Sequence, residues 1–151
     1  VEVDYVSLNQ PDREGRIIVP HTLVWTGLRW HVRGWCEKNQ DYRDFVLSRF
    51  RGEPEVLDAS DHTSASDEDW HTLVTIEIAP DPRLTADQQA VVAHDYGMTD
   101  GKWQLSVRAK LLPYLLQLLR LDPTQVMEDA RAQQIVILNQ ADIEAWLFPS
   151  G

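Results

Sequence analysis

The sequence has a single cysteine, Cys36, among 151 residues, so no disulfide can form within the chain. Such sparse cysteine use is consistent with a reducing compartment. Long apolar runs are also missing, because the longest (LLPYLLQLL, 111–119) falls well short of the ~20 residues that a spanning helix needs. The chain opens on VEVDYVSL, with neither an initiating methionine nor a signal peptide. We therefore expect a cytoplasmic protein, and we interpret the chain as a fragment or processed piece.

Motifs for catalysis and cofactor binding are equally scarce. The sequence contains no phosphate-binding glycine loop and no dinucleotide fingerprint. Ser, His and Asp occur together in SDHTSASDEDWH (60–71), but a catalytic triad is defined by geometry, and this segment has the composition of a linker. No Cys or carboxylate cluster stands at metal-ligand spacing beside His21 and His31. The sequence thus predicts no catalytic residue, no metal site and no cofactor, and a protein that is not an enzyme.

Basic residues are outnumbered, with 14 Lys or Arg against 24 Asp or Glu and a net charge of −10. This balance argues against nonspecific coating of DNA, which needs a basic surface. The charge is uneven, however. Residues 1–51 hold eight basic and seven acidic side chains, whereas residues 52–151 hold six and seventeen. A local basic site in the N-terminal third is compatible with this distribution, because screening at physiological salt acts over ~8 Å.

A polar, acidic and Ser-rich stretch, DASDHTSASDED at residues 58–69, divides the chain. Its composition is typical of a solvated linker. Before it, turn signals separate short apolar or alternating runs, which favours a small antiparallel β-barrel over residues 1–57. The runs are 1–8, 15–26, 29–37, 41–50 and 53–59.

Residues 70–151 are predicted to form a compact α+β domain. Alternating runs indicate strands at 71–80, 102–109 and 133–139. Thr85 and Gln88 stand in capping-box spacing, and Gly97 is a plausible end of the helix that they begin. Further helices are expected at 111–123, with Pro113 in the first turn, and at 140–148. The Leu-rich run 111–121 is apolar nearly all round, so we expect it in the core, or in the core and a subunit interface.

The segment RWHVRGWCE (29–37) has two dissimilar faces, because side chains alternate across a strand. One face carries Trp30, Val32 and Cys36, which we expect in the core, with Cys36 as a buried and unreactive thiol. The other face carries Arg29, His31, Arg33 and Trp35. Solvation alone is enough to explain Arg29, Arg33 and Trp35.

Neighbouring predicted strands add basic and aromatic side chains, namely Arg16, His21, Tyr42, Arg43, Phe45 and Arg49. Arginine offers a bidentate fork to phosphate, and aromatic rings offer faces on which bases stack. The mixture therefore suits a phosphate-bearing ligand that also stacks. The alternative is a solvated outer face on which the arginines pair with carboxylates such as Glu37 and Asp44.

Residues 15–50 resemble the WYL domain. Trp30-His31-Val32 stands at the name tripeptide, Arg16 and Pro20 precede it, and YRDFVLSRF follows. VVAHDYGMTDGKWQLSVRAKLLPYLLQLLRLD (91–122) is similar to the C-terminal extension domain that often follows WYL, in the version found in regulators of bacterial anti-phage defence islands. The resemblance covers nearly the whole chain. His31 and Val32 replace the usual Tyr and Leu of the family. The segment Phe45-Val46-Leu47-Ser48-Arg49 has one arginine fewer than the common pattern. Both departures concern the identity of the ligand more than the fold.

The resemblance implies a homodimeric, cytoplasmic transcriptional regulator, with repression favoured, whose WYL domain binds a nucleic-acid or nucleotide-like anionic effector. Operator DNA would be bound by an N-terminal winged helix-turn-helix that is absent from this chain, and no membrane would be involved. The expected fold class is mixed β and α+β, an SH3-like small β-barrel followed by the compact α+β extension domain. The implied ligand-binding residues are Tyr5, Ser7, Arg16, His21, His31, Tyr42, Arg43 and Arg49.

Two other functions stay open. A peptide- or protein-binding module is one, because SH3-like folds often recognise partners through aromatic grooves. A nucleotide hydrolase ranks lower, because no general base is paired with a nucleophile or a metal.

Overall fold

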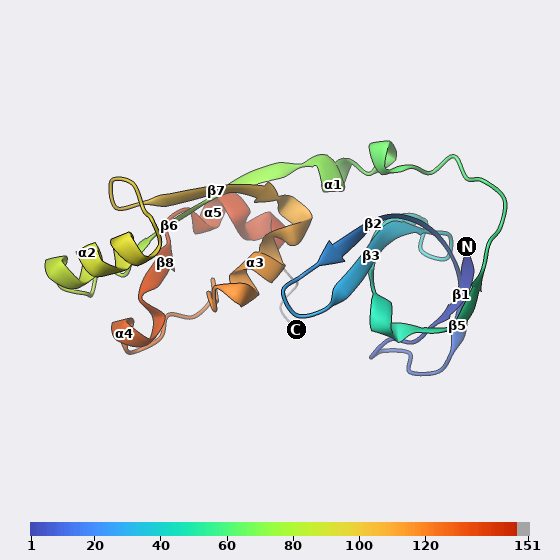
Figure 1. Ribbon diagram of the computed structural model, residues 1–151, viewed down its shortest axis with the longest axis horizontal. Coiled ribbons are helices and arrows are strands. Elements are labelled where there is room, and N and C mark those ends of the chain that lie inside the picture. Colours follow the sequence, from blue (N-terminus) through green and yellow to red (C-terminus); the bar gives the residue numbers. More distant parts are fainter. Residues whose placement is uncertain (148–151) are drawn as a thin grey trace. The chain divides into compact units, whose positions relative to one another are not determined.

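The computed structural model describes residues 1–147. It divides the chain into two compact units, Val1–His71 and a second unit that begins at Thr72 (Figure 1). Each unit has an antiparallel sheet of its own. Among the described residues, helices longer than four residues occur only in the second unit, so the fold is mixed α/β.

The first unit is built on a five-stranded sheet in the order β4-β3-β2-β1-β5. Its strands are β1 (Glu2–Tyr5), β2 (Glu14–Trp25), β3 (Trp30–Cys36), β4 (Asp41–Val46) and β5 (Phe50–Glu55). The long β2 pairs first with β1 and then with β3. After β4, the 3-10 turn η1 (Leu47–Arg49) leads to β5, which pairs with β1. Within residues 1–147 no ladder joins β4 to β5, so the sheet is open where a closed barrel was expected.

A bulge in β2 sets the direction of His21. The register with β3 shifts between Pro20 and Thr22, which leaves His21 as the extra residue. A proline is tolerated there because a bulge disrupts the ladder locally. Opposite the bulge, a Cβ atom on Gly34 would lie 2.5 Å from the Val19 carbonyl oxygen. The close approach of β2 therefore requires glycine at position 34.

One face of this sheet holds the apolar core, made of Val3, Tyr5, Ile18, Val32, Cys36 and Phe45. Cys36 is fully buried, as the sequence predicted. The prediction for Trp30 is wrong, because its side chain is 48% exposed and pairs with the exposed Trp25 across the β2–β3 hairpin. The expectation of a solvated Arg33 is also wrong, since this side chain is 2% exposed and meets buried acidic partners.

The second unit joins a three-stranded sheet, in the order β7-β6-β8, to several short helices. The strands are β6 (Leu73–Pro80), β7 (Trp103–Arg108) and β8 (Ile135–Ile137), and the helices are α2 (Ala86–Asp95), α3 (Leu112–Leu118), α4 (Ala130–Gln133) and α5 (Gln140–Ile143), with 3-10 turns η3 (Ala109–Leu111) and η4 (Glu144–Trp146). The predicted capping box is confirmed, because the Thr85 hydroxyl accepts from the Gln88 amide and the Gln88 side chain accepts from the Thr85 amide. Pro113 lies in the first turn of α3, as predicted.

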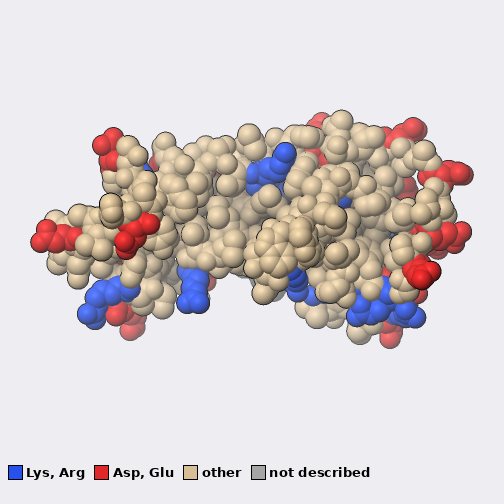
Figure 2. Space-filling model, in the orientation of Figure 1, with Lys and Arg blue, Asp and Glu red and all other residues tan. Residues whose placement is uncertain are grey.

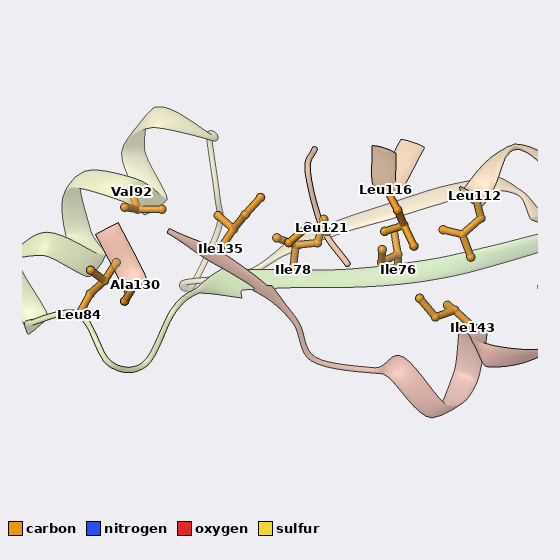
Figure 3. Close-up of a cluster of buried hydrophobic side chains, with 10 residues drawn as sticks. All are labelled: Ile76, Ile78, Leu84, Val92, Leu112, Leu116, Leu121, Ala130, Ile135 and Ile143. Atoms are coloured by element: carbon orange, nitrogen blue, oxygen red, sulfur yellow. The ribbon is translucent and has the colours of Figure 1, made fainter. Parts of the chain in front are cut away.

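Side chains from β6, α2, α3, β8 and α5 meet in the core of the second unit (Figure 3). Ile76 and Ile78 of β6 are fully buried at its centre. The Leu-rich run contributes Leu112, Leu116 and Leu121 to this core, whereas Leu118 is exposed. The expectation that this run belongs to the core is confirmed for those three leucines. No helix within residues 1–147 is both long enough and apolar enough to cross a membrane.

Candidate functional site

Five of the eight ligand-binding residues predicted from the sequence line one pocket of the first unit, with a volume of about 510 Å³. They are Tyr5, Ser7, Arg16, Arg43 and Arg49. Five further lining residues were not predicted as ligand-binding: Asn9, Gln10, Asn39, Asp44 and Phe45. We call this space the arginine pocket. Its arginines and amides are the side chains that bind phosphate oxygens and base edges through hydrogen bonds.

An aromatic cluster supports one end of the arginine pocket. The buried Tyr5 ring lies 5.3 Å from the Phe45 ring and 5.1 Å from the Phe50 ring, between centroids. The Tyr5 hydroxyl accepts a hydrogen bond from the Val46 amide at 3.0 Å, which fixes the ring against β4. The Arg16 guanidinium lies 5.8 Å from the Tyr5 ring centroid, in cation–π range.

The arginines of the pocket differ in how firmly they are held. Arg16 donates to Glu14 at 3.0 Å, to the Gln10 side chain at 3.3 Å and to the Asn39 side chain at 3.4 Å. The hydrogen bond from Lys38 is the main reason why the pKa of Glu14 lies below its ordinary value, so this carboxylate stays charged beside Arg16. Arg43 is exposed and its Nε atom lies 3.7 Å from an Asp41 oxygen, whereas Arg49 is half-buried at the end of η1.

His31, the sixth predicted residue, is buried in β3 with 4% of its surface exposed. Burial is the main cause that lowers its pKa below the ordinary value of 6.5; Asp44 opposes this effect, and the charges of Arg29 and Arg49 add to it. A neutral imidazole therefore lies close to the arginine pocket without lining it. The part of His31 in ligand binding stays a prediction.

His21 and Tyr42, the last two predicted residues, lie on the face of the sheet that alternates with the core face. Residues 62–71, which we call the strap, run along this face and include η2 (Ser64–Ser66) and α1 (Glu68–His71). The His62 ring stacks on Trp35 with 3.9 Å between centroids. The Tyr42 hydroxyl donates to the Thr63 carbonyl oxygen at 2.7 Å. Tyr42 therefore contacts the strap and is not among the residues that line the arginine pocket.

A buried ion network lies beneath the strap. Arg33 donates from Nε and Nη2 to the two oxygens of Asp67, at 2.6 and 2.8 Å, and His21 Nε2 lies 3.0 Å from the Asp67 Oδ2 atom. Arg33 and Asp67 are both 2% exposed. Arg33 also donates from Nη1 to Asp44 at 3.3 Å. No local pattern predicts this network, because Asp67 stands in a stretch with the composition of a solvated linker.

The charged groups of the network stabilise one another. Burial raises the pKa of Asp67, but the hydrogen bonds from Arg33 and His21 lower it by more, so the pKa lies below its ordinary value. Burial lowers the pKa of Arg33, and its two aspartate partners raise it by more. Both side chains are therefore charged at neutral pH, as a stable buried ion pair requires.

Other cavities are less polar. In the second unit a pocket of about 750 Å³ adjoins α3 and is lined by Pro113, Leu116, Leu121 and neighbouring residues. Although larger, it has fewer converging cations than the arginine pocket. At the β2–β3 hairpin, a pocket of about 320 Å³ is lined by Trp25, Arg29, Trp30, Leu47 and Ser48.

Surface charge gives no sign of a broad basic surface on the face drawn in Figure 2. Blue side chains lie there in small separate groups among red and tan ones. Among residues 1–147, no group of three His, Cys, Asp or Glu side chains is placed to hold a metal ion. The arginine pocket is thus a local group of three arginines in a chain whose net charge is −10.

Comparisons with known proteins identify both units. Residues 1–53 match the WYL domain, and residues 73–143 match the BrxR transcriptional regulator, C-terminal dimerization domain. The DNA-binding transcriptional repressor CapW of Stenotrophomonas maltophilia is 35% identical over 147 residues, which is 97% of this chain and 49% of that protein. CapW of Escherichia coli (strain KTE188) is 37% identical with the same coverage. The chain thus spans about half the length of the curated relatives that it matches.

Among solved structures, proteasome accessory factor B/C of Arthrobacter aurescens aligns with 96% of this chain and 23% of that chain. The identity is 19% and the TM-score is 0.35.

Proposed function

This chain belongs to the proteins that join a WYL domain to a BrxR-type C-terminal dimerization domain, and we propose that it is the effector-sensing and dimerisation region of a DNA-binding transcriptional repressor. The CapW relatives, which are described as DNA-binding transcriptional repressors, support the repressor assignment. In this proposal the protein acts as a homodimer in the cytoplasm in a regulatory circuit of phage defence. Operator DNA is bound by a winged helix-turn-helix outside this chain. The chain has no catalytic role, and we assign the first unit to the SH3-like architecture.

The effector in this proposal is a nucleic acid or a nucleotide-like anion bound in the arginine pocket. The observation that carries it is the convergence of Arg16, Arg43 and Arg49 on one pocket with three amide side chains and an aromatic end wall. Arginine forks match phosphate oxygens in pairs, and amides match base edges. A pocket for an uncharged ligand has no need of three arginines.

The effector acts on repression only if it binds one conformation of the dimer better than the other, because equal affinity shifts no equilibrium. We place that preference in the arginine pocket. Its residues include members of strands β1, β2 and β4 and of the η1 turn, so a bound anion joins three strands of the sheet and the turn after β4.

The test is the affinity for a fluorescein-labelled, 5′-phosphorylated thymidine tetranucleotide, measured by fluorescence anisotropy. Arg43→Gln and Arg49→Gln should each weaken binding about tenfold, since a hydrogen bond to a charged group contributes about 1.5–3 kcal/mol. Arg13→Gln is the matched control. It removes the same positive charge from the same unit, but Arg13 does not line the pocket. Equal affinities of the wild type and both pocket variants would overturn the proposal.

A peptide- or protein-binding module is the second candidate function. The exposed pair Trp25 and Trp30, 5.4 Å apart between ring centroids, favours it, because this pair borders a small pocket with Leu47. Aromatic grooves of this kind bind peptides through apolar contact. Loss of partner binding on Trp30→Ala, with tetranucleotide binding unchanged, would assign the hairpin to this second function.

A further inference from the structure

We propose that Arg33 couples the arginine pocket to the strap, so that an anion bound in the pocket loosens the strap from the sheet. This inference rests on the proposed function, because it names how that same pocket is read out. In this inference Arg33 and Asp44 are positioning residues. They do not bind the ligand themselves, and they act on the strap through Asp67.

Asp44 is the structural link between the two regions. It lines the arginine pocket, and its Oδ1 atom accepts from Arg33 Nη1 at 3.3 Å. The other two donors of the same guanidinium bind Asp67 in the strap. A single buried cation is therefore shared between Asp44, a residue that borders the pocket, and Asp67 of the strap.

Charge explains why an anion in the pocket should loosen the strap and not tighten it. The Asp44 carboxylate, 25% exposed, is paired with Arg33, and Asp44 borders the pocket that Arg43 and Arg49 also line. A bound phosphate neutralises Arg43 and Arg49 and repels Asp44, which then interacts more strongly with Arg33. Since Arg33 is shielded from water, a stronger contact with Asp44 weakens its contact with Asp67.

Asp67 holds the end of the strap. Its Oδ1 atom accepts from the Trp70 amide at 3.3 Å, at the start of α1. The Trp70 ring is buried, 6.0 Å from the His21 ring and 5.9 Å from the Arg33 guanidinium. Helix α1 ends at His71, directly before Thr72, where the unit that carries the dimerization-domain match begins. Weakening the Asp67 contacts thus frees the segment that leads into the second unit.

Hydrogen exchange of the strap amides measures this coupling. In the wild type, a saturating concentration of the 5′-phosphorylated thymidine tetranucleotide should speed exchange of the Asp67 and Trp70 amides at least about fivefold, the lower end of typical coupling between sites. Asp44→Asn should abolish the response. Asp41→Asn is the matched control and should retain it, because Asp41 is an acid of the same strand whose carboxylate contacts Arg43 rather than Arg33.

A second arm needs no ligand. Arg43→Gln combined with Arg49→Gln removes the positive charge that a bound anion would neutralise, so this double variant should also speed strap exchange, whereas Arg13→Gln should not. A tetranucleotide that binds the wild type without changing strap exchange overturns the coupling and leaves the proposed function standing. If the tetranucleotide does not bind, the proposed effector class is overturned. The double variant alone then decides the coupling, which holds if strap exchange rises and fails if it does not.

Discussion

Arg33 and Asp67 form a fully buried, two-pronged ion pair that joins β3 to the strap across 34 positions of sequence. His21, directed by the bulge in β2, and Asp44 of β4 complete the network around them. One ion pair therefore connects three strands of the sheet with the segment that leads to the second unit.

Removing one partner of this pair should be strongly destabilising. Asp67→Asn leaves the buried Arg33 charge with Asp44 as its remaining carboxylate partner, which costs about 3 kcal/mol in the free energy of unfolding. Urea unfolding of the first unit measures the change. Replacing both partners, as Arg33→Met with Asp67→Leu, should recover much of the loss, because apolar side chains of similar volume need no charge partner.

The control for this prediction is the exposed pair Arg13 and Asp4, whose side chains are 59% and 43% exposed. Arg13→Gln should change stability by less than about 1 kcal/mol, as is usual for surface pairs. An Asp67→Asn variant as stable as the Arg13→Gln variant would contradict the structural role given to the buried pair.

Gly34→Ala should destabilise the first unit by about 1–3 kcal/mol, as overpacking does. The added methyl group would meet the Val19 carbonyl oxygen at 2.5 Å and the Pro20 Cα atom at 2.8 Å, and backbone atoms of a paired strand cannot move aside cheaply. Gly15→Ala is the matched control in the neighbouring strand β2, because its nearest neighbours are side-chain atoms at 3.6 and 3.9 Å. Thermal unfolding of the two variants should differ clearly, and equal melting temperatures would count against the close approach of β2 and β3.

His31 should make the first unit sensitive to mild acid. Its pKa in the folded chain lies below 6.5, mainly through burial, so the unfolded chain binds more protons once the pH falls below 6.5. The free energy of unfolding therefore falls as the pH drops from that value toward the folded pKa, and this loss is absent above it. Melting temperatures taken across this range should fall less in His31→Gln than in the wild type. An equal fall in the two proteins would contradict this role of His31.

Much of the fold could be predicted because the signals are local. Alternation in β6, the capping box of α2 and the position of Pro113 depend on neighbours within a few residues, and all three are confirmed. Trp30 was misplaced because alternation assigns a side to a residue but cannot tell a strand's centre from an exposed hairpin. An open or closed sheet likewise depends on whether distant edge strands pair, which their own sequences do not determine.

The candidate site was predictable only in part for the same reason. Five of the residues that the family resemblance implied, Tyr5, Ser7, Arg16, Arg43 and Arg49, line one pocket, and their binding of a ligand stays a prediction. Arg33 was dismissed as solvated because its partner Asp67 lies 34 positions away in a polar stretch, and no local pattern connects the two. Tyr42 and His21 lie beneath the strap. The sequence did not predict this position, because the polar composition of residues 62–71 does not indicate that they run over the sheet.

The most direct test of the central claim, that the arginine pocket binds a phosphate-bearing effector, is the salt dependence of tetranucleotide binding. Each phosphate neutralised on a single strand contributes about −0.7 to the slope of log K against log salt concentration. The slope for the wild type should be steep. The double variant, Arg43→Gln with Arg49→Gln, should have a shallower slope, reduced by the contribution of about one phosphate contact for each arginine removed. Identical slopes for the wild type and this double variant would contradict the assignment of the pocket.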